Sequence, residues 1–186
     1  MIDKHGYRPN VGMIIINNEN KVFWGRRIGQ KSWQFPQGGI DNSESLVDAM
    51  YRELWEETGL KPEHVEIVSE TNDWLSYDLP KRYRRKNTVP LCIGQKQKWF
   101  LLRLVVDDDA IDLNQGKKAE FDAFRWVDYW YPVRKVIYFK RQVYRHALSE
   151  LCQDAGITPP QRLSPYHYQK RNKSGKQRHF RHRPST

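Results

Sequence analysis

The sequence predicts one α/β domain, residues 1–155, followed by a basic tail, residues 156–186. Short apolar runs rich in Val, Ile and aromatic residues are separated by Asn, Gly and Pro, a pattern typical of buried strands joined by turns. Two longer segments, 45–58 and 132–153, have the composition or the apolar spacing of helices. At 186 residues the chain is long enough to bury a proper core.

The first expected strand is Val11–Ile16, an apolar run that indicates a buried strand. A turn at Asn17–Asn20 leads into the second strand. The later strands follow the first helix and precede the second. In chain order, the expected strands are 11–16, 21–27, 65–68, 74–77, 99–106 and 121–127.

The segment 45–58 is expected to be helical because it lacks Pro and Gly and is rich in Leu, Met, Ala and Glu. Ser43 and Ser45 are both suitable N-caps. Gly59 is suited to end the helix, because glycine readily adopts the left-handed conformation found there.

Three glutamates, Glu53, Glu56 and Glu57, stand at i, i+3 and i+4 of this helix and therefore share one face. Like charges at this spacing repel and weaken a helix unless a cation lies among them. Carboxylate oxygens suit Mg²⁺ and Mn²⁺. The glutamates alone leave two interpretations open, a solvated acidic face and a metal site.

The flanking residues favour the metal site. Arg52 directly precedes the glutamates and can pair with one of them, and Gly38-Gly39 lets the backbone approach a metal or phosphate closely. From Gly38 to Leu60 the pattern is Gly, five residues, Glu, seven residues, then Arg-Glu-apolar-any-Glu-Glu-any-Gly-apolar. This pattern resembles a complete Nudix box, matched at every defined position.

Segments outside the box narrow the resemblance to the bacterial RNA pyrophosphohydrolases of the Nudix superfamily. The resemblance covers about residues 1–150, and the tail lies outside it. The segments that carry it beyond the box are 6–12, 32–39, 92–100 and 130–134. It implies an α/β/α sandwich with a mixed sheet between helices, in agreement with the order of elements above.

The resemblance also implies an activity, the metal-dependent hydrolysis of the 5′-triphosphate end of RNA. The products would be 5′-monophosphate RNA and pyrophosphate, or phosphate released stepwise, and the reaction would initiate decay of messenger RNA. Mg²⁺ or Mn²⁺ is the implied cofactor, with more than one ion per site. Such ions neutralise phosphate oxygens and lower the pKa of a bound water.

The resemblance further assigns roles to individual residues. Glu53, Glu56 and Glu57 would hold the metal ions, with the Gly38 carbonyl nearby. Glu120 would be a further ligand or a general base, and which glutamate accepts the proton is left open. The residues expected to act in catalysis are Glu53, Glu57, Glu120 and Arg52. The residues expected to bind substrate are Arg8, Arg27, Gln37, Gln95, Lys98 and Lys140 at the phosphates, and Tyr77 and Phe139 at the bases.

From the residues alone, several of these positions have a second interpretation. Arg8 and Arg27 stand near strand ends and suit either the surface or a phosphate site. Phe139 and Lys140 near the start of the last helix suit either core packing or the border of a cleft. A lone glutamate such as Glu120 suits an exposed position.

The net charge of +10 comes mainly from the tail, residues 156–186, which holds eight Lys or Arg and no acidic residue. We expect this tail to be disordered, and either to bind RNA through counterion release or only to increase solubility. A second acid-free segment, 79–106, interleaves basic residues with Tyr and Trp, which suits a polyanion as well as a solvated loop.

Cys92 and Cys152 are far apart and in no metal-ligand spacing, which indicates free thiols in a reducing compartment. The N-terminus has no apolar signal segment, and no apolar run approaches the ~18–20 residues needed to span a membrane. We therefore expect a cytoplasmic protein with no membrane partner. We also expect a monomer, and nothing in the sequence identifies an activating protein.

Two other functions remain open. The same metal site would serve the hydrolysis of free dinucleoside polyphosphates such as diadenosine pentaphosphate, although the basic segment 79–106 favours a longer polyanion. The third function is that of a catalytically inactive RNA-binding module. Such a module usually lacks one of the box acids, whereas Arg52 and all three glutamates are present here.

Overall fold

An eight-stranded sheet forms the centre of the fold in the computed structural model, which describes residues 2–84, 89–116 and 119–159. The path β3-β2-β1-β7-β5 runs across it, while β4 pairs with β1, β6 with β7 and β8 with β2. The strands are β1 (Tyr7–Ile16), β2 (Val22–Arg27), β3 (Trp33–Gln34), β4 (Gln37–Gly39), β5 (Val65–Glu70), β6 (Leu75–Asp78), β7 (Gly94–Leu104) and β8 (Phe121–Val127).

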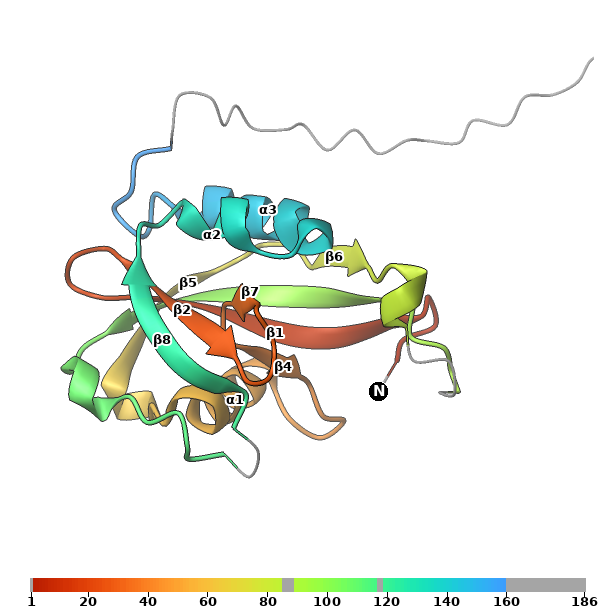
Figure 1. The fold of residues 1–186 in the computed structure, drawn as a ribbon, viewed down its shortest axis with the longest axis horizontal. Helices are drawn as coiled ribbons and strands as arrows, with labels where there is room; N and C mark the ends of the chain where they lie inside the picture. The colour runs from red at the N-terminus through yellow and green to blue at the C-terminus, as the bar shows by residue number, and fades with distance from the viewer. Residues whose placement is uncertain (1, 85–88, 117–118, 160–186) are drawn as a thin grey trace, which may run out of the picture.

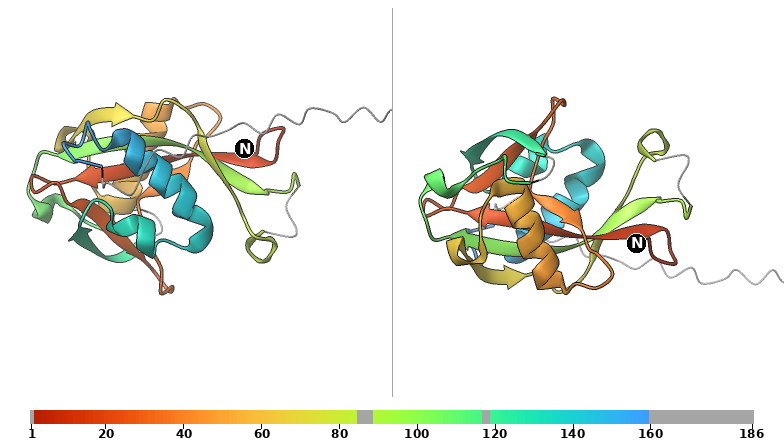
Figure 2. Two further views of the ribbon diagram at one scale, coloured as in Figure 1. Left: turned by 90° about the horizontal axis from the view of Figure 1, so that it is seen from above. Right: turned by 90° about the horizontal axis from the view of Figure 1, so that it is seen from below.

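Helices cover both faces of this sheet (Figure 1). Helix α1 (Leu46–Thr58) packs on one face, and α2 (Tyr131–Lys135) and α3 (Arg141–Leu151) pack on the other (Figure 2). Alternate side chains of β1 supply two cores: Met13 and Ile15 face α1, while Ile14 and Ile16 face α3. The predicted α/β/α architecture is confirmed.

The sheet is mixed because β1 and β7 run parallel and the other pairs are antiparallel. Both strands begin earlier than the expected 11–16 and 99–106. Their polar N-terminal parts pair with each other, so that Arg8 lies opposite Gln95. The sequence analysis left these polar parts outside the expected strands because they lack the apolar pattern of a strand. The pairing carries polar side chains from two strands to one edge of the molecule.

The start and end of α1 follow from its caps. The Ser45 hydroxyl accepts a hydrogen bond from the Asp48 N–H at 3.1 Å, and the Asp48 carboxylate accepts one from the Ser45 N–H at 3.3 Å. Gly59 ends the helix at a φ of 71°, and its N–H donates to the Trp55 carbonyl. Ser45 is thus the N-cap, rather than Ser43.

The prediction of one helix over 132–153 is wrong, because an extended backbone at Val136 (φ −63°, ψ 154°) separates α2 from the rest. A short 3₁₀ turn, η4 (Tyr138–Lys140), then leads into α3. The apolar spacing located the buried residues but not the break, because Val136 is buried and fits that spacing although its backbone is extended. The break holds η4 against the end of the sheet, where Phe139 and Lys140 reach a cavity.

The described residues include no helix that is both long enough and apolar enough to cross a membrane. Cys92 and Cys152 are both free thiols, as predicted. The predicted disorder of the tail concerns residues that, beyond Pro159, lie outside the described ranges.

Candidate active site

The glutamates of the box lie on adjacent turns of α1, beside β4. Glu57 is almost fully buried, and its Oε2 accepts a hydrogen bond of 2.8 Å from the Gln37 N–H. The Glu53 side chain is also largely buried, whereas that of Glu56 is about half exposed. The carboxylates therefore range from a buried position to the solvent along one helix face.

Two glycines of β4 make room for charged side chains. A Cβ at Gly38 would lie 1.7 Å from Glu53 Cδ, and a Cβ at Gly39 would lie 2.1 Å from Arg8 Nη2. Real Cβ atoms essentially never approach other atoms so closely. Only glycine at these positions lets Glu53 and Arg8 lie directly against the backbone of β4.

Arg52 fixes the position of Glu53. Its Nε and Nη2 donate to the two carboxylate oxygens of Glu44, at 3.0 and 2.6 Å, in a bidentate pair. Its Nη1 donates to Glu53 Oε1 at 2.8 Å, and its Nη2 donates to the Gly39 carbonyl at 2.8 Å. The contact with Arg52 lowers the pKa of Glu44. One guanidinium thus joins the loop before α1, the helix and β4.

Replacing Arg52 with lysine is expected to lower the free energy of unfolding by about 1–2 kcal/mol, because a single ammonium cannot satisfy three partners held by a planar fork. Urea unfolding at neutral pH measures this loss. Arg26→Lys is the matched control, since Arg26 contacts Asp122 through an exposed pair. Equal losses in the two variants would contradict the joining role of Arg52.

A cavity of about 530 Å³ lies between this acidic face and η4. It brings together most of the residues expected from the sequence, from five strands, α1, η4 and the segment before β8. Those that line it are Arg8, Arg27, Gln37, Gly38, Glu53, Glu56, Tyr77, Gln95, Glu120, Phe139 and Lys140. Arg52 and Glu57 do not line the cavity but hydrogen-bond to residues that do: Arg52 to Glu53, and Glu57 to Gln37.

The charges at the acidic end favour a bound cation. Burial raises the pKa of Glu57 well above its ordinary value, and Glu120 and Glu53 raise it further. Burial also raises the pKa of Glu53, against the opposing effect of Arg52. A divalent cation would offset this repulsion, and the carboxylate oxygens, with the Gly38 carbonyl, are a donor set that fits Mg²⁺ or Mn²⁺.

Within the described ranges, no three His, Cys, Asp or Glu side chains already form a metal-binding group. The Glu53 carboxylate is bound to Arg52, and Glu57 is bound to the Gln37 N–H. A metal would therefore share these carboxylates with their present partners. The buried position of Glu57 is the observation that fits a cation best.

Lys140 supplies a buried cation to the same cavity. Its ammonium is buried, donates to Gln34 Oε1 at 3.1 Å and Gln37 Oε1 at 2.9 Å, and lies 5.7 Å from the Tyr77 ring centroid. Burial, and then the nearby Arg27, lower the pKa of Lys140 to about 7. An anion bound here would raise that pKa again, so Lys140 is suited to bind phosphate.

The low pKa of Lys140 predicts a pH dependence of stability. The pKa of Lys140 is about 7 in the folded state and 10.5 ordinarily. Between pH 7 and pH 10.5 the unfolded chain therefore binds more protons than the folded one. The free energy of unfolding should therefore rise with pH across this window. In Lys140→Met this rise should be smaller by a few kcal/mol, as measured by urea unfolding at neutral and alkaline pH. The exposed control Lys61→Met should show the same rise as the wild type. An equal rise in Lys140→Met and the wild type would contradict the lowered pKa of Lys140.

Glu120 lies at the edge of the cavity, just before β8. Its Oε2 is 3.9 Å from Arg27 Nη2, and its carbonyl accepts a hydrogen bond of 3.0 Å from the Ile28 N–H. Glu120 is close enough to Glu57 to raise the pKa of that buried carboxyl. The role of Glu120, as a further metal ligand or as a general base, stays a prediction.

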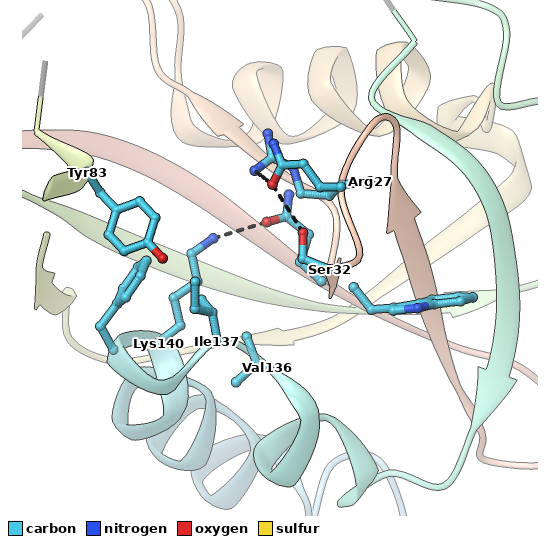
Figure 3. Close-up of a pocket in the computed structure, with 10 residues that line it drawn as sticks. Arg27, Ser32, Tyr83, Val136, Ile137 and Lys140 are labelled. Atoms are coloured by element: carbon cyan, nitrogen blue, oxygen red, sulfur yellow. Dashed lines mark hydrogen bonds between the residues drawn. The ribbon is translucent and has the colours of Figure 1, made fainter. Parts of the chain in front are cut away.

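Aromatic side chains form the remaining wall. The Phe139 ring lies 5.8 Å from Tyr77 and 5.2 Å from Tyr83, centroid to centroid, and the Tyr77 hydroxyl donates to Gln95 Oε1. A second cavity, of about 390 Å³, adjoins the first and shares Phe139 and Tyr83 with it. In this hollow Tyr83 and Arg27 lie on opposite sides, with Lys140 between them (Figure 3).

Lys98 lies outside this cavity, contrary to expectation. Strand alternation turns it to the face of β7 opposite Gln95. Its ammonium donates to the carbonyls of Thr71 and Asn72 and lies 3.2 Å from Glu70 Oε1. Lys98 therefore holds the connection between β5 and β6, and its charge is already paired there.

The sequence analysis missed several residues that line the cavity, among them Asn10, Gln34 and Tyr83. Gln34 is buried and accepts a hydrogen bond from Lys140, and Asn10 Oδ1 is buried with no hydrogen-bond partner among the described residues. The signal for Asn10 was its position two residues after Arg8, on the same face of a strand. Gln34 and Tyr83 carried no comparable signal, because their contacts come from a turn distant in sequence.

This combination of a Gly-Gly strand, an acidic helix and a polar cavity defines the chain as a Nudix domain. The profile of the NUDIX domain matches residues 6–151, and the chain therefore belongs to the Nudix family. Nudix hydrolases generally use divalent metal ions.

The chain is also similar to two curated relatives, each named RNA pyrophosphohydrolase. The relative from Thioalkalivibrio sulfidiphilus is 57% identical over 175 residues, which cover 94% of this chain and 99% of the relative. The relative from Shewanella pealeana is 61% identical over 152 residues, covering 82% of this chain and 88% of the relative. The similarity thus extends well beyond the box.

Solved structures support the fold. The dihydroneopterin triphosphate pyrophosphohydrolase of E. coli superposes with a TM-score of 0.58 at 18% identity, over 75% of this chain and 95% of that chain. A C. elegans Ap4A hydrolase complex superposes with a TM-score of 0.55, also at 18% identity, over 74% of this chain and 93% of that chain. At such identities the similarity shows a shared fold only, and it does not bear on the substrate.

Proposed function

We propose that this protein hydrolyses the 5′-triphosphate end of RNA, leaving 5′-monophosphate RNA and releasing pyrophosphate, or phosphate in steps. The observation that carries the proposal is the lining of one cavity: carboxylates of α1 gather at one end, cations lie beside them, and an aromatic wall adjoins both. Relatives named RNA pyrophosphohydrolase, similar over most of the chain, support the choice of substrate. We infer that the reaction initiates decay of messenger RNA.

The cationic side of the cavity is suited to the phosphate chain. Arg8 and Arg27 bring two guanidinium groups, and Lys140 brings an ammonium that lacks a carboxylate partner among the described residues. Gln37 and Gln95 add side-chain amides beside them. Together these groups would orient the polyphosphate so that its reacting phosphorus faces the acidic end.

The acidic side is suited to divalent ions, Mg²⁺ or Mn²⁺, and we expect more than one per site. Glu53, Glu56 and Glu57 would hold them, with the Gly38 carbonyl nearby. Bound ions supply charge neutralisation of the phosphate oxygens and a lowered pKa for an attacking water. Arg52 keeps Glu53 in place, and we retain Glu53, Glu57 and Glu120 as candidates for the general base.

The aromatic wall is suited to the first bases of the RNA. Phe139 borders both cavities, and its ring packs beside that of Tyr83. Stacking of a base on an aromatic ring is worth roughly 1–3 kcal/mol and tolerates any base. The smaller cavity (Figure 3) therefore offers room for a base while the phosphates occupy the larger one.

The experiment that tests this proposal compares two substrates in one assay. With Mg²⁺ present, kcat/KM for a 5′-triphosphate RNA should exceed that for diadenosine pentaphosphate. The aromatic wall would contact successive bases that follow the triphosphate in RNA, whereas in diadenosine pentaphosphate the whole phosphate chain separates the two bases. Equal efficiency would favour dinucleoside polyphosphates as the substrates, and binding of RNA without any turnover would favour an inactive binding module.

We further expect the enzyme to act in the cytoplasm as a monomer.

A further inference from the structure

The aromatic wall continues outward, beyond both cavities. The ring centroids of Phe139 and Tyr138 are 5.4 Å apart at an interplanar angle of 86°. Tyr138 borders neither cavity and is 52% exposed, and Tyr83 is 44% exposed. Phe139 therefore joins the interior of the site to a pair of exposed rings on η2 (Lys81–Tyr83) and η4.

A guanidinium lies between these exposed rings. Arg82 Cζ is 4.9 Å from the Tyr83 centroid and 5.9 Å from the Tyr138 centroid. Arg82 forms no ion pair with a carboxylate in the part of the chain that the structure describes. Its positive charge remains available to an anion outside the protein.

Exposed rings beside an available cation suit single-stranded nucleic acid, because bases stack on the rings and phosphates meet the cation. Two features select this occupant over a protein partner. The surface is continuous with the cavity through Phe139 and Tyr83, and the neighbouring Lys81 makes the patch basic rather than purely apolar.

We propose that Tyr138 and Arg82, with the exposed part of Tyr83, form a stacking platform for the RNA strand just downstream of the nucleotides held in the cavities. The inference rests on the proposed function and adds to it a second region of substrate contact. It assigns a specificity for length: an unpaired strand that reaches the platform binds more tightly than one that ends within the cavities.

The test uses two substrates with the same first nucleotides, a dinucleotide carrying a 5′-triphosphate and a longer single-stranded RNA. For Tyr138→Leu, KM for the longer RNA should rise about tenfold, as expected for the loss of one stacked base, with kcat unchanged. KM for the dinucleotide should stay within about twofold of the wild type, since a dinucleotide does not reach the platform. Tyr138→Phe keeps the ring and should behave as the wild type with both substrates.

Trp74→Leu is the matched control. Trp74 is also an exposed ring beside a cation, Lys96 at 5.3 Å, but it borders neither cavity. Trp74→Leu should leave the ratio of KM for the longer RNA to KM for the dinucleotide unchanged. Because the platform gives Arg82 a phosphate contact, Arg82→Gln should reduce the slope of log KM against log salt for the longer RNA by about one. An unchanged slope would remove Arg82 from the platform.

Two results would overturn the platform. An equal change in both KM values on Tyr138→Leu would place Tyr138 in general packing of the site, and no change in either would exclude it from RNA binding. In both cases the wild type would still cleave triphosphate RNA, so the proposed function would stand. If the wild type cleaved neither RNA, the proposed function would fail first, and the platform with it.

Discussion

Replacing Glu57 with glutamine is expected to reduce turnover about a thousandfold or more, the effect of losing several kcal/mol of transition-state stabilisation. Glutamine has nearly the same shape and can still accept the hydrogen bond from the Gln37 N–H. It carries no charge, however, so it holds a divalent cation much more weakly and cannot act as a general base. The loss should therefore appear in kcat rather than in folding.

The same substitution should leave the protein at least as stable at neutral pH. Burial holds the pKa of Glu57 above its ordinary value of 4.5, so the folded state disfavours the ionised carboxylate. This penalty is absent below the ordinary pKa and grows as the pH rises through the folded-state value. Glutamine removes it, and the thermal midpoint should stay the same or rise.

Activity and thermal unfolding, measured on the same preparations, check both parts of this prediction. Glu63→Gln is the matched control, because Glu63 is exposed in the 3₁₀ turn Pro62–His64, away from the cavity. It should retain full activity. Turnover by Glu57→Gln close to that of the wild type would contradict the role of the acidic end.

Replacing Gly38 with alanine is expected to lower kcat/KM at least about a hundredfold, the cost of a misplacement near 1 Å in an active site. The new Cβ would lie 1.7 Å from Glu53 Cδ, so the Glu53 carboxylate must leave its place against β4. A displaced Glu53 also loses its present contact with Arg52. Binding of Mn²⁺, followed by titration, should weaken together with activity.

Gly156→Ala separates this effect from backbone strain. Gly156 has a φ of 71° and no other group within 4 Å of the added Cβ, so alanine there is strained but does not collide. It should cost roughly 1–2 kcal/mol of stability and no activity. A Gly38→Ala variant with normal activity and normal Mn²⁺ affinity would show that Glu53 does not need its position against β4.

Local patterns predicted the parts of the fold and site that local physics controls. The spacing of Glu53, Glu56 and Glu57 determines that they share a face of α1, wherever that helix packs. The strands of the core followed from apolar runs such as Val11–Ile16, which have no alternative to burial.

Long-range pairing controls what the sequence analysis missed. The polar start of β7 is a strand only because β1 and β6 pair with it, and no pattern within 94–98 indicates those partners. That pairing also decides which side chains face the cavity, and it turned Lys98 away from Gln95. The break at Val136 likewise depends on tertiary packing, since the segment satisfies helical spacing on its own.

The central claim is that this site removes phosphate from the 5′-triphosphate end of RNA, and one measurement tests it most directly. Wild-type protein and Glu57→Gln are incubated with Mg²⁺ and RNA labelled at its γ-phosphate, and both the released label and the 5′ end of the RNA are identified. The predicted result is label in pyrophosphate or phosphate and a 5′-monophosphate RNA, with the wild type alone. Label that stays on the RNA, under conditions where diadenosine pentaphosphate is cleaved, would contradict the claim.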